Sequence, residues 1–149
     1  HDIGKIGIDD SVLRKPGRLT PAEFEHIKLH PELGYNILRD VKQLEDVLPI
    51  VLHHHEAWDG SGYPHGLAGE DIPLPARIAA VADAFDAMSS DRPYRKGMPD
   101  EKVDGIFRDG SGRQWDEQVV DAFFAVRDDI RDICSDQRAN LAIDVQQWI

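Results

Sequence analysis

The apolar positions of this chain recur every three or four residues, which is the period of a helix. One such stripe runs from Leu44 to Val51 and continues into His54 and His55. A second stripe comprises Ile78, Val81, Ala82, Phe85 and Met88. The sequence contains no convincing strand-period segment, repeat or low-complexity tract. The pattern therefore predicts an all-α fold, with both histidines facing inward.

Prolines and capping residues set the expected helix boundaries. Thr20-Pro21-Ala22-Glu23 has the form of a capping box with proline at the first helical position, which predicts a helix to about Leu29. Further helices are expected over 31–39, from an Asp46 cap to about 55, over 75–90, over 100–108, from an Asp116 cap to about 134, and less regularly over 135–149. Residues 59–73 hold four glycines and two prolines, which predicts a long functional loop.

Composition indicates one globular domain. The chain has 149 residues, of which 41% are hydrophobic and 30% charged. Its net charge of −11 argues against binding of nucleic acid polymers, and the acidic residues concentrated in 100–149 are typical of a solvated face. No apolar run suits a membrane span, no secretory signal is present, and the single Cys134 fits a reducing compartment. Because the chain starts at His1 without a helix cap, we expect it to lack the first helices of its domain.

The candidate chemistry lies in histidines and aspartates. The His53-His54-His55 triplet ends a helix, and burying several imidazoles without partners is unfavourable. A satisfied histidine cluster, a tag-like accident and a metal site all remain open for this triplet. Taken singly, the His1-Asp2 pair is a weak signal and His30 is typical of a helix end. Asp83 and Asp86 are, singly, typical of caps or ion-pair partners.

Taken together, these side chains indicate metal binding. The combined set comprises His1, Asp2, His30, His54, His55 and Asp83, without a thiolate. Mixed nitrogen and oxygen donors suit iron, manganese or zinc in a hydrolytic site rather than structural zinc. Four imidazoles and two carboxylates exceed what one tetrahedral ion requires. We therefore expect two or more ions, since an aspartate beside a histidine can bridge a pair.

Five motifs over residues 1–125 resemble those of an HD-GYP domain, a member of the HD phosphohydrolase superfamily. They are His1-Asp2-Ile3-Gly4-Lys5, His30-Pro31, the run from His54-His55-Glu56 to Gly62-Tyr63-Pro64, the run from Ala79 to Met88, and Ser90-Asp91-Arg92-Pro93-Tyr94-Arg95. Members of this family hydrolyse the bacterial second messenger cyclic di-GMP. The resemblance implies an HD-domain helical bundle over residues 1–134 without its first helices, followed by a C-terminal extension of unknown role.

The resemblance also implies roles for the metal ligands. His1, Asp2, His30, His54, His55 and Asp83 match ligands of the family, with Asp2 as the bridging carboxylate. Lys5 matches a lysine that contacts the scissile phosphate or the bridging water. The implied cofactors are two or more divalent ions, iron or manganese first, with zinc, nickel and magnesium as alternatives.

Other positions match the substrate side of the family site. Arg92 and Arg95 match cations near the bound dinucleotide, and Lys96 is their neighbour. Gly62-Tyr63-Pro64 is the motif loop, whose tyrosine either stacks on a base or orders the loop. Asp86 matches an acid that supports the ligands.

The resemblance thus implies a metal-dependent phosphodiesterase that converts cyclic di-GMP to the linear dinucleotide pGpG or onward to GMP. It also implies a cytoplasmic location and an upstream receiver or sensor domain. Two alternatives stay open. One is an HD phosphohydrolase acting on another nucleotide, and the other is a non-catalytic module that recruits a GGDEF-type cyclase.

Overall fold

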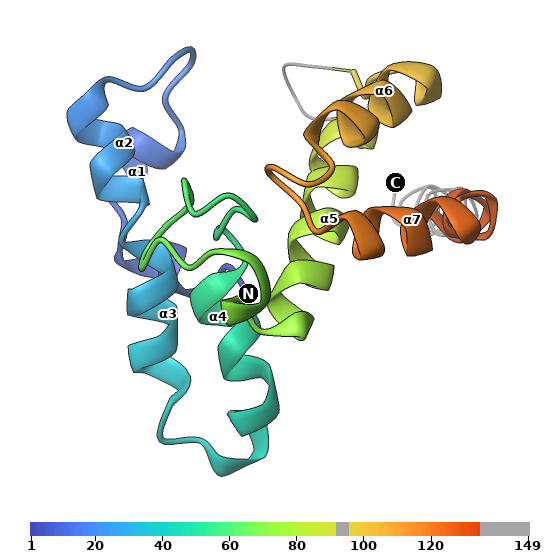
Figure 1. Cartoon of the computed structure of the whole chain (residues 1–149). Coiled ribbons are helices and arrows are strands. Elements are labelled where there is room, and N and C mark those ends of the chain that lie inside the picture. The colour runs from blue at the N-terminus through green and yellow to red at the C-terminus, as the bar shows by residue number, and fades with distance from the viewer. Residues whose placement is uncertain (92–95, 135–149) are drawn as a thin grey trace, which may run out of the picture.

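The computed structural model describes residues 1–91 and 96–134, which form helices joined by loops (Figure 1). The helices are η1 (Ile3–Gly7), α1 (Asp10–Leu13), α2 (Pro21–Ile27), α3 (His30–Leu38), η2 (Lys42–Val47), α4 (Leu48–His53), η3 (Gly69–Asp71), α5 (Leu74–Ser89), α6 (Asp100–Gly110) and α7 (Glu117–Ala125), where η denotes a 3₁₀ helix. Strand-like pairing in these residues is limited to two isolated bridges. The predicted all-α class is confirmed. Each described helix is too short or too polar to cross a lipid bilayer.

The first half of the fold is organised by close backbone packing. Helix η1 packs on α3, α3 on α4, and α4 on α5. A Cβ atom at Gly4 would lie 1.9 Å from the carbonyl oxygen of His30 and 2.4 Å from the backbone nitrogen of Gly34. Only glycine permits this approach. The contact places Asp2, which directly precedes η1, beside the first turn of α3.

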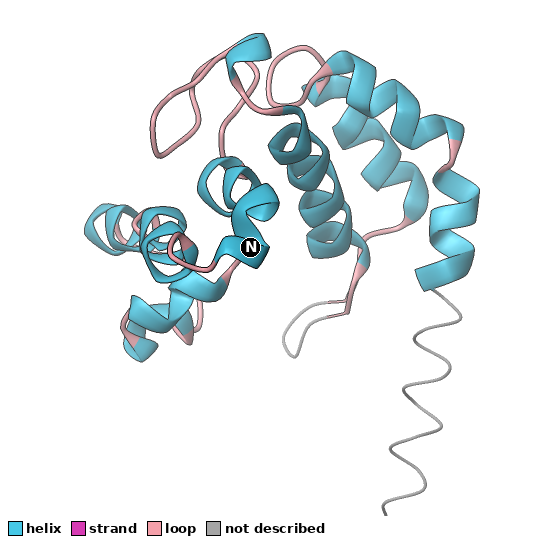
Figure 2. Cartoon of the chain, turned by 90° about the horizontal axis from the view of Figure 1, so that it is seen from below, coloured by secondary structure: helices cyan, strands magenta, loops and turns pink. Residues whose placement is uncertain are grey.

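The main hydrophobic core lies in the second half, among α5, α6 and α7. Figure 2 shows these three helices grouped together. The Phe123 ring lies between those of Phe85 and Phe107, with centroid separations of 5.3 and 4.9 Å. Val103 and Phe107 are fully buried. Helix α5 belongs to both halves, because it contacts α4 as well as α6 and α7.

The predicted core stripe of α5 is only partly correct. Val81 and Phe85 are buried, as expected, but Ile78 is 52% exposed and Ala82 is also exposed. Both exposed residues line an open groove between α5 and α7 instead of the core. Because α5 is covered by separate helices on different sides, a single apolar stripe does not describe its buried surface.

Two of the three predicted caps are confirmed. The Glu23 backbone N–H donates to Thr20 Oγ1, and the Thr20 N–H donates to Glu23 Oε2, which completes the capping box. Asp116 accepts from the Gln118 N–H at the start of α7. The Asp46 cap is wrong, because Asp46 lies inside η2 and α4 begins after Val47.

Other boundaries differ in detail. Helix α4 ends at His53, so the next two histidines follow it rather than extend it. The helix expected from Asp116 to about 134 is interrupted by a turn at Val126 and resumes over 127–134. Helices η1 and α1 were not expected. The predicted extension at 135–149 lies outside the described residues.

A buried ion pair connects α5 to the start of α7. Arg77 Nη1 donates to Asp116 Oδ2 over 2.7 Å, and the Asp116 side chain is only 3% exposed. We expect Arg77→Ala to lower the free energy of unfolding by about 2 kcal/mol, since it leaves a buried carboxylate short of a partner. Urea unfolding measures this change. Arg14→Ala, at an exposed pair with Asp10, should shift the same quantity by less than about 0.5 kcal/mol. Equal effects of the two substitutions would contradict this assignment.

Candidate metal centre

Three separate segments bring four potential metal ligands together. Asp2 precedes η1, His30 opens α3, and His54 and His55 follow α4. Each offers one ligand atom, and these atoms all lie within 4.8 Å of one another. His30 and His54 are almost completely buried. The structure therefore assembles four of the six predicted ligands into one compact cluster.

The hydrogen bonds of the two buried histidines fix their tautomers. His30 Nδ1 lies 2.7 Å from the Ile27 carbonyl oxygen, and His54 Nδ1 lies 3.0 Å from that of Ile50. A carbonyl only accepts, so each Nδ1 carries the proton and each Nε2 presents a lone pair. The two Nε2 atoms face each other over 3.3 Å. Two facing lone pairs repel unless a cation lies between them, and anchoring of the far nitrogen by a carbonyl is typical of metal-bound histidine.

Asp2 adds a carboxylate oxygen at the same point. Its Oδ1 is buried, accepts no hydrogen bond, and lies 3.4 Å from His30 Nε2 and 3.8 Å from His54 Nε2. Its Oδ2 accepts from Lys5 Nζ at 2.5 Å. The Lys5 ammonium stabilises the charged form of the Asp2 carboxyl. An anionic oxygen and two nitrogen lone pairs thus converge, and this donor set fits a divalent cation.

The other two predicted ligands lie at the edge of this cluster. His1 Nε2 is 3.5 Å from Asp83 Oδ1 and 3.8 Å from Asp2 Oδ2. The His1 ring also packs edge-on against His54, with centroids 4.7 Å apart. A cavity of about 210 Å³ is lined by His54, His55 and Asp83. Asp83 on α5 therefore reaches the cluster through His1 and a shared cavity.

His55 and Tyr63 form the wall of the site toward the motif loop. Their rings stack with centroids 4.8 Å apart and an interplanar angle of 25°. Burial, with the rings of His54 and His30 nearby, lowers the pKa of His55 to about 3. Burial and the negative charges of Asp2 and Asp83 raise the pKa of Tyr63 to about 12. Both rings are consequently neutral at physiological pH.

The motif loop is held against the end of α4. A Cβ atom at Gly62 would lie 2.2 Å from the Ala57 nitrogen and 2.5 Å from the Glu56 Cα. Glycine is therefore required for the loop to turn back over the segment that follows His55. The Tyr63 N–H donates to the His55 carbonyl oxygen over 3.1 Å. These contacts support the interpretation that Tyr63 orders the motif loop.

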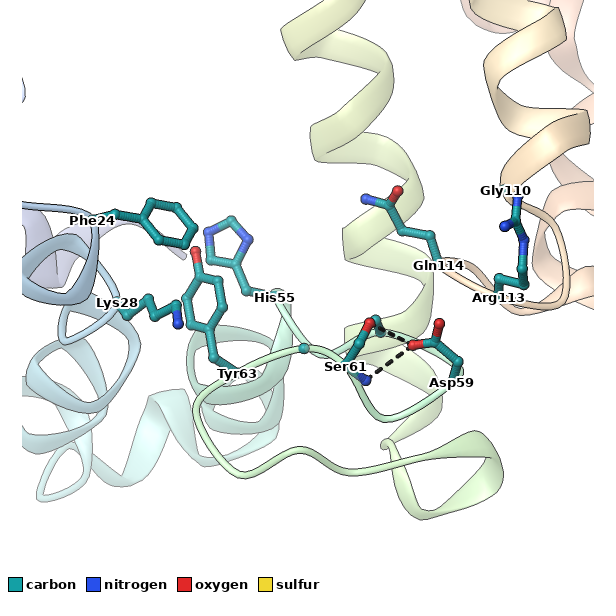
Figure 3. A pocket seen from close by; sticks show the side chains of 11 residues that line it. Phe24, Lys28, His55, Asp59, Ser61, Tyr63, Gly110, Arg113 and Gln114 are labelled. Atoms are coloured by element: carbon teal, nitrogen blue, oxygen red, sulfur yellow. Dashed lines mark hydrogen bonds between the residues drawn. The ribbon is translucent and has the colours of Figure 1, made fainter. Parts of the chain in front are cut away.

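A cavity of about 500 Å³ opens beside His55 and Tyr63 (Figure 3). Its lining includes Phe24 from α2 and Lys28, directly after α2, on one side, and Arg113 and Gln114 from the α6–α7 connection on the other. Lys28 Nζ lies 5.1 Å from the centroid of Phe24 and 5.8 Å from that of Tyr63. Sequence reasoning missed all four residues. The spacing of four between Phe24 and Lys28 places them on one helical face, but nothing local indicates which face meets a cavity.

Not every predicted site residue joins the cluster. Asp86 is exposed, accepts from Ser90 Oγ, and lines the α5–α7 groove rather than the metal centre. Within residues 1–91 and 96–134, the hydrogen bond recorded for the Asp86 side chain joins it to Ser90, so its support of the ligands stays a prediction. Lys96 is exposed. Arg92 and Arg95 lie outside the described residues.

A scan against family models matches the HD domain over residues 1–119. The chain belongs to the HD domain family. A cyclic di-GMP phosphodiesterase of Thermotoga maritima is 47% identical over 89% of this chain and 37% of its own length. The cyclic di-GMP phosphodiesterase response regulator RpfG of Xanthomonas campestris is 46% identical over 90% of this chain and 36% of its own length. This HD domain thus spans little more than a third of the length of these relatives, whose names agree with the predicted resemblance.

A solved structure supports the fold of this HD domain. A cyclic GMP-AMP-specific phosphodiesterase of V. cholerae matches with a TM-score of 0.55 and 22% sequence identity, over 86% of this chain and 33% of the other. The predicted HD-domain fold is confirmed. The family is one of metal-dependent phosphohydrolases, and the cluster has the donor set that such chemistry requires.

Acidification should destabilise this HD domain once its metal has been removed. The pKa of His55 is about 3 in the folded chain, so the unfolded ring, with a usual pKa of about 6.5, binds its proton at higher pH. Stability therefore falls as the pH falls from about 6.5 towards 3. Urea unfolding with a chelator at several pH values measures this. A His55→Gln variant should show a shallower slope, and equal slopes would contradict the assignment.

Proposed function

We propose that this chain is the catalytic domain of a metal-dependent phosphodiesterase that hydrolyses cyclic di-GMP to pGpG or onward to GMP. The observation that carries the proposal is the convergence of Asp2 Oδ1 with the lone pairs of His30 Nε2 and His54 Nε2. The names of the relatives supply the substrate, since several of them are cyclic di-GMP phosphodiesterases.

Two or more divalent ions, with iron or manganese favoured over zinc, nickel or magnesium, would occupy the cluster. Asp2, His30, His54 and His55 would hold them, and His1 and Asp83 would complete the set on the side of α5. Such ions polarise a phosphoryl oxygen and lower the pKa of bound water. Lys5, already paired with Asp2, would neutralise charge that develops on the phosphate.

The 500 Å³ cavity is the proposed binding site for the dinucleotide. It shares His55 with the cluster, so a ligand bound there reaches the ions. Phe24 and Tyr63 offer ring faces to a base, while Lys28 and Arg113 offer positive charge to a phosphate or a guanine edge. A few cations suffice for a small anionic ligand, even in a chain with a net charge of −11.

Removal of the Lys28 charge should weaken substrate binding more than it slows the chemical step. Lys28→Met keeps an aliphatic chain against Phe24 and Tyr63 but loses the ammonium group. We expect KM to rise about tenfold, as for one charged contact, with kcat within a factor of about three. Steady-state kinetics of the intact protein measures both. Lys102→Met on the exposed side of α6 is the matched control. A loss confined to kcat would contradict the binding role.

A second substrate candidate is 3′3′-cGAMP. A 3′3′-cGAMP-specific phosphodiesterase of Vibrio cholerae is 39% identical over 89% of this chain and 27% of its own length. Chromatography of products after incubation of the metal-loaded intact protein with each dinucleotide tests both candidates. Faster turnover of cyclic di-GMP supports the first, faster turnover of cGAMP supports the second, and no turnover of either contradicts the enzymatic proposal in favour of a binding module.

We also propose an upstream receiver domain in the parent protein, because one relative is named as a response regulator. A cytoplasmic location follows from the proposed substrate. The expected GGDEF-type partner remains a prediction without support in the structure or the comparisons.

A further inference from the structure

A second group of metal-ligating side chains lies where α4 meets the motif loop. It consists of His53, Glu56 and His65, called the loop cluster below. Each residue offers one ligand atom, and the three atoms lie within 4.8 Å of one another. None of the three belongs to the metal centre described above.

His53 is not satisfied by protein groups. Its Nδ1 is buried and has no hydrogen-bond partner. The nearest acidic atom is Glu56 Oε1, 3.6 Å away, which is beyond hydrogen-bonding distance. A buried polar atom without a partner is rare and costly. A cation between His53 Nδ1 and Glu56 Oε1 would give this nitrogen the partner that it lacks.

Glu56 is a fully buried carboxylate that lacks a cationic partner among the described residues. Its side chain is 0% exposed, and the ion pair recorded for it there is the long one to His53. The backbone N–H groups of His65 and Leu67 donate to Oε1 and Oε2, over 2.8 and 3.1 Å. These two bonds fix the carboxylate in place. Each oxygen retains a second lone pair for a metal ion.

His65, on the motif loop, supplies the third ligand atom of the group. Its side chain is 47% exposed, and its ring centroid lies 5.3 Å from that of His53. Glu32 at the start of α3 lies on the other side, with Oε1 3.9 Å from His65 Nε2. The loop cluster therefore has a fourth potential ligand that faces solvent.

We propose that His53, Glu56 and His65 bind a zinc ion. Two imidazoles and one carboxylate form a known zinc donor set, with the fourth position left to water or Glu32. Neighbouring ligand atoms around tetrahedral zinc lie about 3.3 Å apart, given bonds of about 2.0–2.1 Å. His53 Nδ1 and Glu56 Oε1 are already near this separation, so only the exposed His65 ring must move. The ion would fasten the segment after Tyr63 to the end of α4.

Zinc stoichiometry tests this proposal. The metal-free intact protein is titrated with zinc chloride, and bound zinc per chain is measured after dialysis by mass spectrometry. His65→Ala, at a half-exposed position, should bind one zinc fewer than wild type. His26→Ala is the matched control, because His26 is a partly exposed histidine near Asp9 and outside both clusters.

A ligand-replacement variant sharpens the result. His65→Cys supplies a thiolate, which is also a zinc ligand, and should regain the lost ion. Equal zinc binding by wild type, His26→Ala and His65→Ala would overturn the proposal. Since His65 lies outside the metal centre, that outcome would leave the proposed phosphodiesterase function intact, and hydrolysis assays on the same proteins separate the two.

Discussion

Asp2→Ala should abolish phosphodiesterase activity, with kcat reduced by more than about 100-fold. Asp2 supplies a carboxylate oxygen that meets the lone pairs of both His30 and His54. Without it, two imidazole nitrogens face each other with no anionic ligand beside them, and Lys5 loses its partner. Even supporting residues around a metal typically change activity by 10- to 100-fold, so loss of a direct ligand should exceed that range. The measurement is hydrolysis of cyclic di-GMP by the metal-loaded intact protein.

The matched control for Asp2→Ala is Asp9→Ala, which removes a nearby carboxylate with a 79% exposed side chain. It should retain wild-type turnover and metal content. Metal analysis separates a lost ligand from a lost catalytic group, because Asp2→Ala should also bind less metal. Normal turnover by Asp2→Ala would exclude the proposed role of this residue.

Gly4→Ala should lower the free energy of unfolding by at least about 3 kcal/mol, the upper part of the usual range for overpacking. The added Cβ would lie 1.9 Å from the His30 carbonyl oxygen, and no rotamer change relieves an overlap with backbone. Helix η1 must move away from α3, which separates Asp2 from His30. Metal affinity should therefore fall together with stability. Urea unfolding and metal titration of the same protein measure the two effects.

Gly105→Ala is the control for Gly4→Ala, and we expect it to raise the free energy of unfolding instead of lowering it. Gly105 lies inside α6, and a Cβ there would meet nothing within 4 Å. The substitution should stabilise the protein by about 0.5–1 kcal/mol, because alanine is the better helix former. Similar changes at both glycines would contradict the close-packing role of Gly4.

Local signals in the sequence were enough for most helices. The Thr20 capping box and the Asp116 cap depend on interactions within one turn, so pattern alone predicts them. The predicted cap at Asp46 is wrong because a 3₁₀ helix and an α-helix follow each other over residues 42–53. A short-range pattern does not distinguish a 3₁₀ turn from the start of an α-helix. The predicted burial of Ile78 is wrong because its exposure depends on the position of α7, which the local sequence does not specify.

The metal centre was predictable in composition but not in detail. Residue types and motif order identified Asp2, His30, His54 and His55 together. The tautomers could not be predicted, since they depend on the carbonyl groups that each ring meets. Likewise, Lys28 and Arg113 converge on one cavity from distant segments, and neither carries a local signature.

The most direct test of the metal centre is anomalous diffraction from crystals of the intact protein grown with manganese. We expect anomalous density at coordination distance from Asp2 Oδ1 and the Nε2 atoms of His30 and His54, with both Nδ1 atoms still hydrogen-bonded to backbone carbonyls. Manganese bound elsewhere in an active enzyme, with no density between these two nitrogens, would contradict it.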